Sequence, residues 1–241
     1  MSALGWVGFN VVMLWAVAFL ADSLLPRTVD APHRVATAPA VATDLGLLFL
    51  FAAQHSVMAR RSVQAWLRRW VPAPLERTTY VLATDVCLAL LFLLWQPFGG
   101  RVWHVAGIGA LVLWSLCAAG WALALAATYA VDQPELMGLR QAGWGRAPEP
   151  VDGLETGGLY AVVRHPLMSG LLLAFWATPS MGASHLLFAL GATGYIAVGV
   201  AFEERDLRRT FGAAYDEYAA RVPAVVPGPR SWRGARLGQE V

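Results

Sequence analysis

The chain has 241 residues, of which 57% are hydrophobic and only 14% are charged. Its mean hydropathy of +0.51 lies far from that of a soluble globular domain, so the composition indicates a protein that is integral to a bilayer. The net charge of +2 is small and the arginines are spread over loops, which excludes nucleic acid as an expected partner.

Apolar runs mark the membrane crossings, each of which needs about 20 residues. They cover residues 5–25, 45–58, 80–95, 105–127 and 167–202. The last run is too long for one crossing, and the cluster of Pro179, Gly182 and Ser184 breaks it in the middle. We therefore predict an all-α polytopic membrane bundle of about six transmembrane helices, ending in a tight helical hairpin and capped by cytoplasmic segments.

The arginines test this topology. With six crossings, fifteen of the eighteen arginines fall on one side of the membrane, and only Arg27, Arg34 and Arg101 fall on the other. The positive-inside rule then places both termini in the cytoplasm. We expect a single membrane domain over residues 1–227, followed by a polar tail over residues 228–241.

The two cysteines give no sign of a metal site. Cys87 and Cys117 lie inside apolar runs, without a CxxC or Cys/His spacing. This pattern predicts buried thiols that take no part in a disulfide, and we expect no metal ligand set.

Two charged clusters flank the last apolar run. Arg164 and His165 precede the run, and Glu203 and Glu204 follow it. Because a hairpin returns its two ends to the same membrane face, the sequence predicts that these four side chains are neighbours. Ionisable groups at such a depth either pair with one another or serve a site, and both interpretations stay open.

The segment after Phe202 has the spacing of a cytoplasmic helix. Leu207, Phe211 and Tyr215 recur at intervals of four residues and share one face. We expect Gly212 to bend this helix and Pro223 to end it.

The stretches "GGLYAVVRHPLMSG" and "EERDLRRTFGAAYDEYAARVPAVVP" resemble the C-terminal signature of the isoprenylcysteine carboxyl methyltransferase and NnrU group of membrane methyltransferases. The stretches "FAAQHSVMAR", "PAPLERTTYVL", "GLRQ" and "FWATPSM" resemble, more narrowly, bacterial methanethiol S-methyltransferases. The similarity covers most of residues 45–227. One departure is Met168, which stands where the group's pattern has tyrosine, so one hydrogen bond to a cofactor is in doubt.

The resemblance implies S-adenosylmethionine as methyl donor, S-adenosylhomocysteine as product, and a cofactor pocket built from residues 128–227. Arginine and histidine suit the cofactor's carboxylate, glutamates suit its ribose hydroxyls, and aromatic rings suit its adenine and sulfonium. Proline would start the helix at a fixed angle, and glycine would let a backbone or ligand come close. The predicted cofactor contacts are Tyr160, Arg164, His165, Pro166, Gly170, Glu203, Glu204, Tyr215 and Tyr218.

Methyl transfer to sulfur needs the thiolate, so a base or a positive field would help. His55 and Gln54 end the second apolar run at the predicted cytoplasmic face, and Arg140 lies in the long cytoplasmic loop. We predict that these three residues act on the substrate. An interfacial hydrogen-bonding role for His55 and a solvated-loop role for Arg140 stay open.

Three functions remain in view. The first is transfer of a methyl group to a small membrane-permeable thiol such as methanethiol, giving dimethyl sulfide, by an enzyme of the bacterial inner membrane with a cytoplasmic active site. The second is methylation of an isoprenylcysteine or another lipid-like acceptor by the same fold. The third is a non-catalytic NnrU-like membrane subunit, in which the charged clusters are purely structural.

Overall fold

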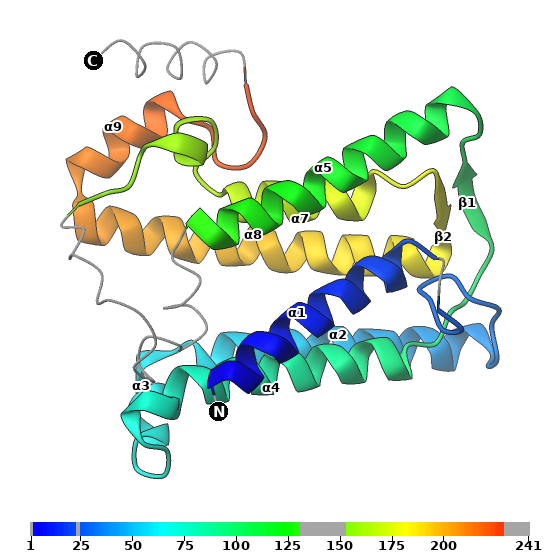
Figure 1. Cartoon of the computed structure of the whole chain (residues 1–241), viewed down its shortest axis with the longest axis horizontal. Coiled ribbons are helices and arrows are strands. Elements are labelled where there is room, and N and C mark those ends of the chain that lie inside the picture. Colours follow the sequence, from blue (N-terminus) through cyan, green and yellow to red (C-terminus); the bar gives the residue numbers. More distant parts are fainter. Residues whose placement is uncertain (1, 23–24, 131–152, 229–241) are drawn as a thin grey trace. The chain divides into compact units, whose positions relative to one another are not determined.

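In the computed structural model, residues 2–22, 25–130 and 153–228 are described (Figure 1). They form two compact units. The first unit contains the residues up to 109 together with 178–192, and the second contains 110–130, 153–177 and 193–228. Each unit is described by itself below, and the single domain expected over residues 1–227 stays a prediction.

The first unit is built on helices α1 (Ser2–Leu20), α2 (Thr37–Met58), α3 (Arg61–Leu67) and α4 (Ala73–Leu94). Helix α4 packs against both α1 and α2, and the short α3 lies at their end (Figure 1). Aromatic rings hold this packing together: the Phe19 and Phe92 centroids lie 4.9 Å apart, and Trp95 meets Phe19 edge-on at 6.1 Å.

A two-stranded ribbon interrupts the helical pattern of the first unit. Strand β1 (Arg101–His104) pairs antiparallel with β2 (Ser180–Gly182). Asp30 accepts hydrogen bonds from the backbone amides of Gly182 at 2.7 Å and His185 at 3.0 Å. Gly182 is the last residue of β2, and His185 lies in the first turn of α8, where no helical carbonyl is available to its amide. A Cβ atom on Gly182 would lie 2.2 Å from Asp30 Oδ1, so the contact requires glycine.

The second unit contains α5 (Ile108–Ala130), the 3₁₀ turn η1 (Gly158–Ala161), α7 (Pro166–Trp176), most of α8 (Ala183–Phe211) and α9 (Ala213–Arg221). Helices α5 and α7 touch through their backbones. A Cβ atom on Gly170 would lie 2.5 Å from the Ala124 nitrogen, and one on Gly120 would lie 2.6 Å from the Ala174 nitrogen. The predicted close approach at Gly170 is thus made by the backbone of a neighbouring helix.

Within residues 2–22, 25–130 and 153–228, four helices are long and apolar enough to cross a membrane: Thr37–Met58, Leu75–Leu94, Ile108–Tyr129 and Ala183–Phe211. The apolar helices α1 and α7 are shorter, and the 11 residues of α7 extend only about 17 Å against a hydrocarbon core of about 30 Å. The predicted break within residues 167–202 is confirmed, because α7 ends at Trp176 and α8 begins at Ala183. The chain is therefore an integral membrane helical bundle, and the count of six crossings remains a prediction.

The contact between α5 and α7 predicts a stability effect at Gly170. Replacing Gly170 by Ala should lower the free energy of unfolding by about 1–3 kcal/mol, because the new methyl group meets backbone atoms that cannot rotate away. Thermal unfolding in detergent, followed by circular dichroism, measures this. Gly194→Ala in α8 is the matched control, since a Cβ atom there meets nothing within 4 Å; equal melting temperatures for the two variants would contradict the prediction.

Candidate active site

The charged cluster predicted from the two ends of the last apolar run is confirmed within the second unit. The Arg164 guanidinium pairs with Glu204 through Nε at 3.0 Å and through Nη2. Their side chains are only 10% and 13% exposed. A buried pair of this kind is costly to separate, because each partner would leave an uncompensated charge behind.

Arg164 also holds the end of α9. Its Nη1 donates to the carbonyl oxygens of Ala219, at 3.1 Å, and Val222. The last carbonyls of a helix lack helical partners, and a cationic donor at that end is favourable. All three nitrogens of the Arg164 guanidinium are thus engaged by the protein.

His165 lies between the two glutamates. It is buried, its Nδ1 is 3.4 Å from Glu203 Oε2, and its Nε2 is 3.4 Å from Glu204 Oε1. Glu204 is mostly covered, whereas the Glu203 side chain is 54% exposed. Glu203 therefore presents a carboxylate that a ligand can reach, and the buried His165 imidazole lies against one of its oxygens.

The chain after α9 runs back along the start of α7. The amides of Arg164 and His165 donate to the carbonyls of Pro223 and Ala224, both at 2.9 Å. The Ser169 hydroxyl donates to the Val225 carbonyl at 2.5 Å. Pro166 begins α7, as proline does at a first helical turn. The backbone thereby fixes the position of the charged cluster independently of its side chains.

Residues 158–165 and 203–225 form what we call the cap of the second unit, and the two tyrosines of α9 lie in its interior. Tyr215 is fully buried, Tyr218 nearly so, and their ring centroids lie 6.0 Å apart, with Val222 completing the cluster. The Tyr218 hydroxyl donates to the Tyr160 carbonyl at 2.7 Å, and burial raises the pKa of Tyr218 to about 12. Burial also raises the pKa of Tyr160 and Tyr215. Packing accounts for both α9 rings, and contact of Tyr160, Tyr215 or Tyr218 with a cofactor stays a prediction.

None of the three residues predicted to act on the substrate belongs to the described part of the second unit. His55 and Gln54 belong to α2 in the first unit, and Arg140 lies outside the described residues. The Tyr80 hydroxyl is 3.0 Å from both ring nitrogens of His55. Gln54 donates to Met58 Sδ at 3.2 Å, while its buried Oε1 has no hydrogen-bond partner among the described residues.

Several polar residues of the first unit escaped the sequence analysis. Tyr80 and Thr84 both lie near His55. Tyr80 stood in a quoted stretch and Thr84 lies two residues beyond that stretch, and neither was singled out. Asp44 and Asp85 are buried within α2 and α4. A lone carboxylate inside an apolar span was the signal that could have identified both, since such residues seldom occur without a role.

Fold and site together define a helical integral membrane protein with a buried charged cluster at the cap of its second unit. The chain is 44% identical to a methanethiol S-methyltransferase of Mycobacterium tuberculosis over 95% of both chains. It is 43% identical to methanethiol S-methyltransferase 2 of Bradyrhizobium diazoefficiens, over 94% of this chain and 88% of the other. It is 34% identical to pig nurim over 70% of this chain and 68% of the other.

The chain belongs to the methanethiol S-methyltransferase family, as identities of 43–44% over nearly the whole length show. No family model matches the sequence, and no solved structure matches it.

The two roles of Arg164 predict that its loss unfolds the cap. Arg164→Ala should lower the free energy of unfolding by about 3–5 kcal/mol, because Glu204 is left buried without a partner and α9 loses its terminal contacts. Hydrogen exchange should become fast at residues 222–225. Arg209→Ala is the control: Arg209 pairs with Asp206 on the surface and should cost less than about 1 kcal/mol. Unchanged exchange in Arg164→Ala would refute the structural role.

Tyr218 predicts that the cap loosens in alkali. Because the pKa of Tyr218 is raised from 10.0 to about 12 in the folded protein, its contribution to stability is complete below pH 10. The contribution is lost as the pH rises from 10 to about 12, since ionisation removes the proton donated to the Tyr160 carbonyl. The free energy of unfolding, measured as a function of pH, should fall more steeply above pH 10 for the wild type than for Tyr218→Phe. Parallel curves for the two proteins would contradict this.

Proposed function

We propose that the protein transfers a methyl group from S-adenosylmethionine to methanethiol, giving dimethyl sulfide and S-adenosylhomocysteine. The observation that carries this proposal is the similarity, at 38–46% identity over 88–95% of the chain, to proteins named methanethiol S-methyltransferase. The buried cluster of Arg164, His165 and Glu204 supports it, because a membrane protein keeps such charges together at a functional site or a structural joint.

The residues of the cap suit S-adenosylmethionine. Glu203 presents a half-exposed carboxylate that can accept from ribose hydroxyls or from the ammonium group of the cofactor. The guanidinium of Arg164 supplies a positive charge that suits the cofactor's carboxylate, and the His165 ring lies 3.4 Å from Glu203 and orients it.

When bound, S-adenosylmethionine supplies an electrophilic methyl group on a sulfonium sulfur. The chain's contribution in this proposal is to hold the cofactor's polar ends: Glu203 accepts hydrogen bonds, Arg164 supplies positive charge, and His165 orients Glu203. Because Arg164 is also engaged by Glu204 and the end of α9, exchanging the charges of Arg164 and Glu204 would not restore the site. A glutamate at position 164 has no donors for the α9 carbonyls.

The topology belongs to the same proposal. We place the protein in the bacterial inner membrane with about six crossings, α1 and α7 adding to the four long helices. Both termini and the active site then face the cytoplasm, because that side receives fifteen of the eighteen arginines. His55, Gln54 and Arg140 are proposed to act on the thiol.

The direct test uses the purified full-length protein in detergent. Incubation with methyl-labelled S-adenosylmethionine and methanethiol should give labelled dimethyl sulfide, measured by gas chromatography, together with S-adenosylhomocysteine. Labelled ester on a prenylated cysteine, without thiol turnover, would favour the lipid-like acceptor. Absence of cofactor binding in calorimetry would end the proposal of an S-adenosylmethionine-dependent enzyme.

Glu203 is the residue that separates cofactor binding from cap stability. Glu203→Gln should weaken S-adenosylmethionine binding by roughly 10- to 150-fold, which corresponds to the loss of a charged hydrogen bond of about 1.5–3 kcal/mol. The melting temperature should stay at the wild-type value, since the Glu203 side chain is half-exposed and its ion pair among the described residues is with His165. Glu217→Gln, an exposed change on α9, is the control in the same calorimetric titration. Equal affinities for the two variants would remove Glu203 from the site.

A further inference from the structure

A short helix joins two membrane helices of the first unit. Helix α3 follows α2, which ends at Met58, and precedes the apolar part of α4, which begins at Leu75. Helices α2 and α4 pack along each other, and α3 lies at an end that they share (Figure 1). Because both are long enough to cross the hydrocarbon core, this shared end places α3 at the level of the lipid headgroups.

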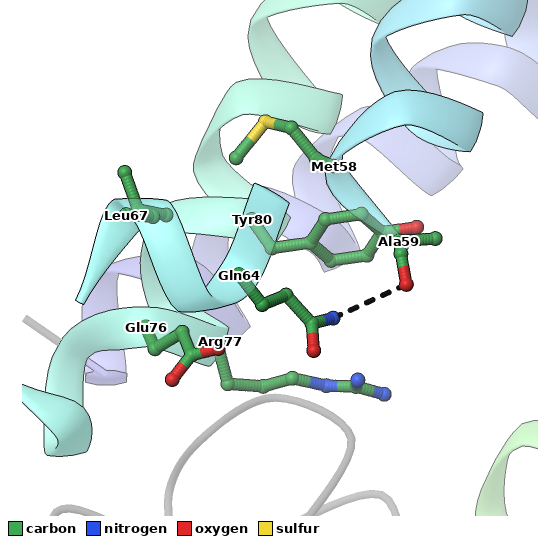
Figure 2. A pocket seen from close by; sticks show the side chains of 7 residues that line it. All are labelled: Met58, Ala59, Gln64, Leu67, Glu76, Arg77 and Tyr80. Atoms are coloured by element: carbon green, nitrogen blue, oxygen red, sulfur yellow. Dashed lines mark hydrogen bonds between the residues drawn. The ribbon is translucent and has the colours of Figure 1, made fainter. Parts of the chain in front are cut away.

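Apolar burial inside the protein contributes little to α3. The helix has seven residues, whereas isolated helices shorter than about 12–15 residues are marginal in water. Within the described part of the chain, none of its residues is buried. Gln64 and Leu67 line a cavity of about 290 Å³ between α3 and its neighbours (Figure 2). Two polar contacts hold the segment in place: Gln64 donates to the Ala59 carbonyl at 3.4 Å, and Arg68 binds Glu76 at 2.8 Å.

Two large aromatic side chains of this segment are exposed. Trp66 is 56% exposed and Trp70 is 76% exposed. The turn after α3 keeps a helical hydrogen bond, since the Val71 amide donates to the Leu67 carbonyl at 2.9 Å. The two tryptophans are four residues apart and therefore neighbours on one side of the segment. Tryptophan in this position is typical of the boundary between membrane and water.

The same segment is strongly basic. Residues 59–72 contain four arginines and no acidic residue. Arg68 is paired with a carboxylate of α4. Arg60, Arg61 and Arg69 are exposed, and within the described ranges they have no ion-pair partner. Guanidinium groups suit phosphate oxygens, because their N–H groups form a fork that matches two of them. The charge of this surface therefore matches a phosphodiester.

We propose that Arg60, Arg61, Arg69, Trp66 and Trp70, here called the basic aromatic patch, bind the headgroups of anionic phospholipids. The arginines donate to the phosphodiester, and the indole rings enter the boundary between headgroups and acyl chains. A zwitterionic lipid also carries a phosphate, but its ammonium group is repelled by the arginines, so the anionic lipid binds more tightly. The patch lies wholly within the first unit, and this inference does not depend on methyl transfer.

The first test uses the full-length wild type in nanodiscs of phosphatidylcholine, with or without phosphatidylglycerol. Amide hydrogen exchange over residues 61–71 should be about tenfold slower with phosphatidylglycerol, because lipid at about ten times its Kd stabilises the ordered segment by that factor. Exchange over residues 101–104, in β1 of the same unit, should be equal in the two discs. Equal exchange over residues 61–71 would overturn the proposal.

The second test removes the charge of the patch. The triple variant Arg60→Gln, Arg61→Gln, Arg69→Gln should bind phosphatidylglycerol roughly 10²-fold more weakly in native mass spectrometry, because each basic residue near an anionic surface contributes about fivefold. Its affinity for phosphatidylcholine should change much less. In nanodiscs, this variant should show the same exchange over residues 61–71 with both lipid compositions.

The matched control removes three arginines from α8 and α9. Arg205→Gln, Arg209→Gln, Arg221→Gln changes exposed side chains and lowers the net charge by the same amount. It should keep the slower exchange over residues 61–71 in phosphatidylglycerol discs. An equal loss of phosphatidylglycerol affinity in the two triple variants would show a general effect of net charge and overturn the patch.

A soluble phosphate tests whether the bilayer is the source of the anion. Glycerol phosphate added to phosphatidylcholine discs should leave exchange over residues 61–71 unchanged, because it brings no acyl chains to the indole rings. Slowing equal to that caused by phosphatidylglycerol would indicate a site for a free phosphate and overturn lipid as the occupant. The comparisons with the wild type decide the proposal even where a triple variant does not fold.

Discussion

The second unit depends on one buried guanidinium. Arg164 joins Glu204 of α8 to the end of α9 and sits in a backbone that Pro223 and Ala224 pair with. A lysine could carry the same charge, but it could not bind a carboxylate and two divergent carbonyls together. The membrane helices α7 and α8 are apolar, and apolar contacts alone discriminate little between partners. The hydrogen bonds of Arg164 therefore specify that α8 and α9 meet at the start of α7. The same joint presents Glu203 and His165 to a ligand.

The sequence predicted the class of fold and the proximity of the two charged clusters. The break at Pro179 divides the last apolar run into a hairpin, and a hairpin places its two ends on the same face of the membrane. It did not predict the lengths of the helices. The contact of Gly120 with Gly170 lets α5 and α7 approach closely, and such contacts depend on which faces pack. The ribbon of β1 and β2 escaped notice because four and three residues are too few for a periodic pattern.

For the candidate site, the sequence could predict which residues are of a suitable type, but it could not predict which side chains they contact in the fold. His55 stood out as a histidine at the end of an apolar run, but its neighbour Tyr80 comes from another helix, 25 residues away. Tyr215 and Tyr218 are predicted ligand contacts because aromatic rings suit the adenine and sulfonium of the cofactor, and that prediction stands untested. In the folded cap they pack on each other and on Val222, since an isolated amphipathic helix must bury its aromatic face somewhere.

Asp30 has a consequence for the order of biosynthesis. Its carboxylate accepts the amides of Gly182 and His185, which follow it by 152 and 155 residues. At a translation rate of about 5–20 residues per second, these amides leave the ribosome roughly 8–30 s after Asp30. The hydrogen bonds of Asp30 therefore form only once the start of α8 has been synthesised. The helices that precede α8 are made before these bonds can exist.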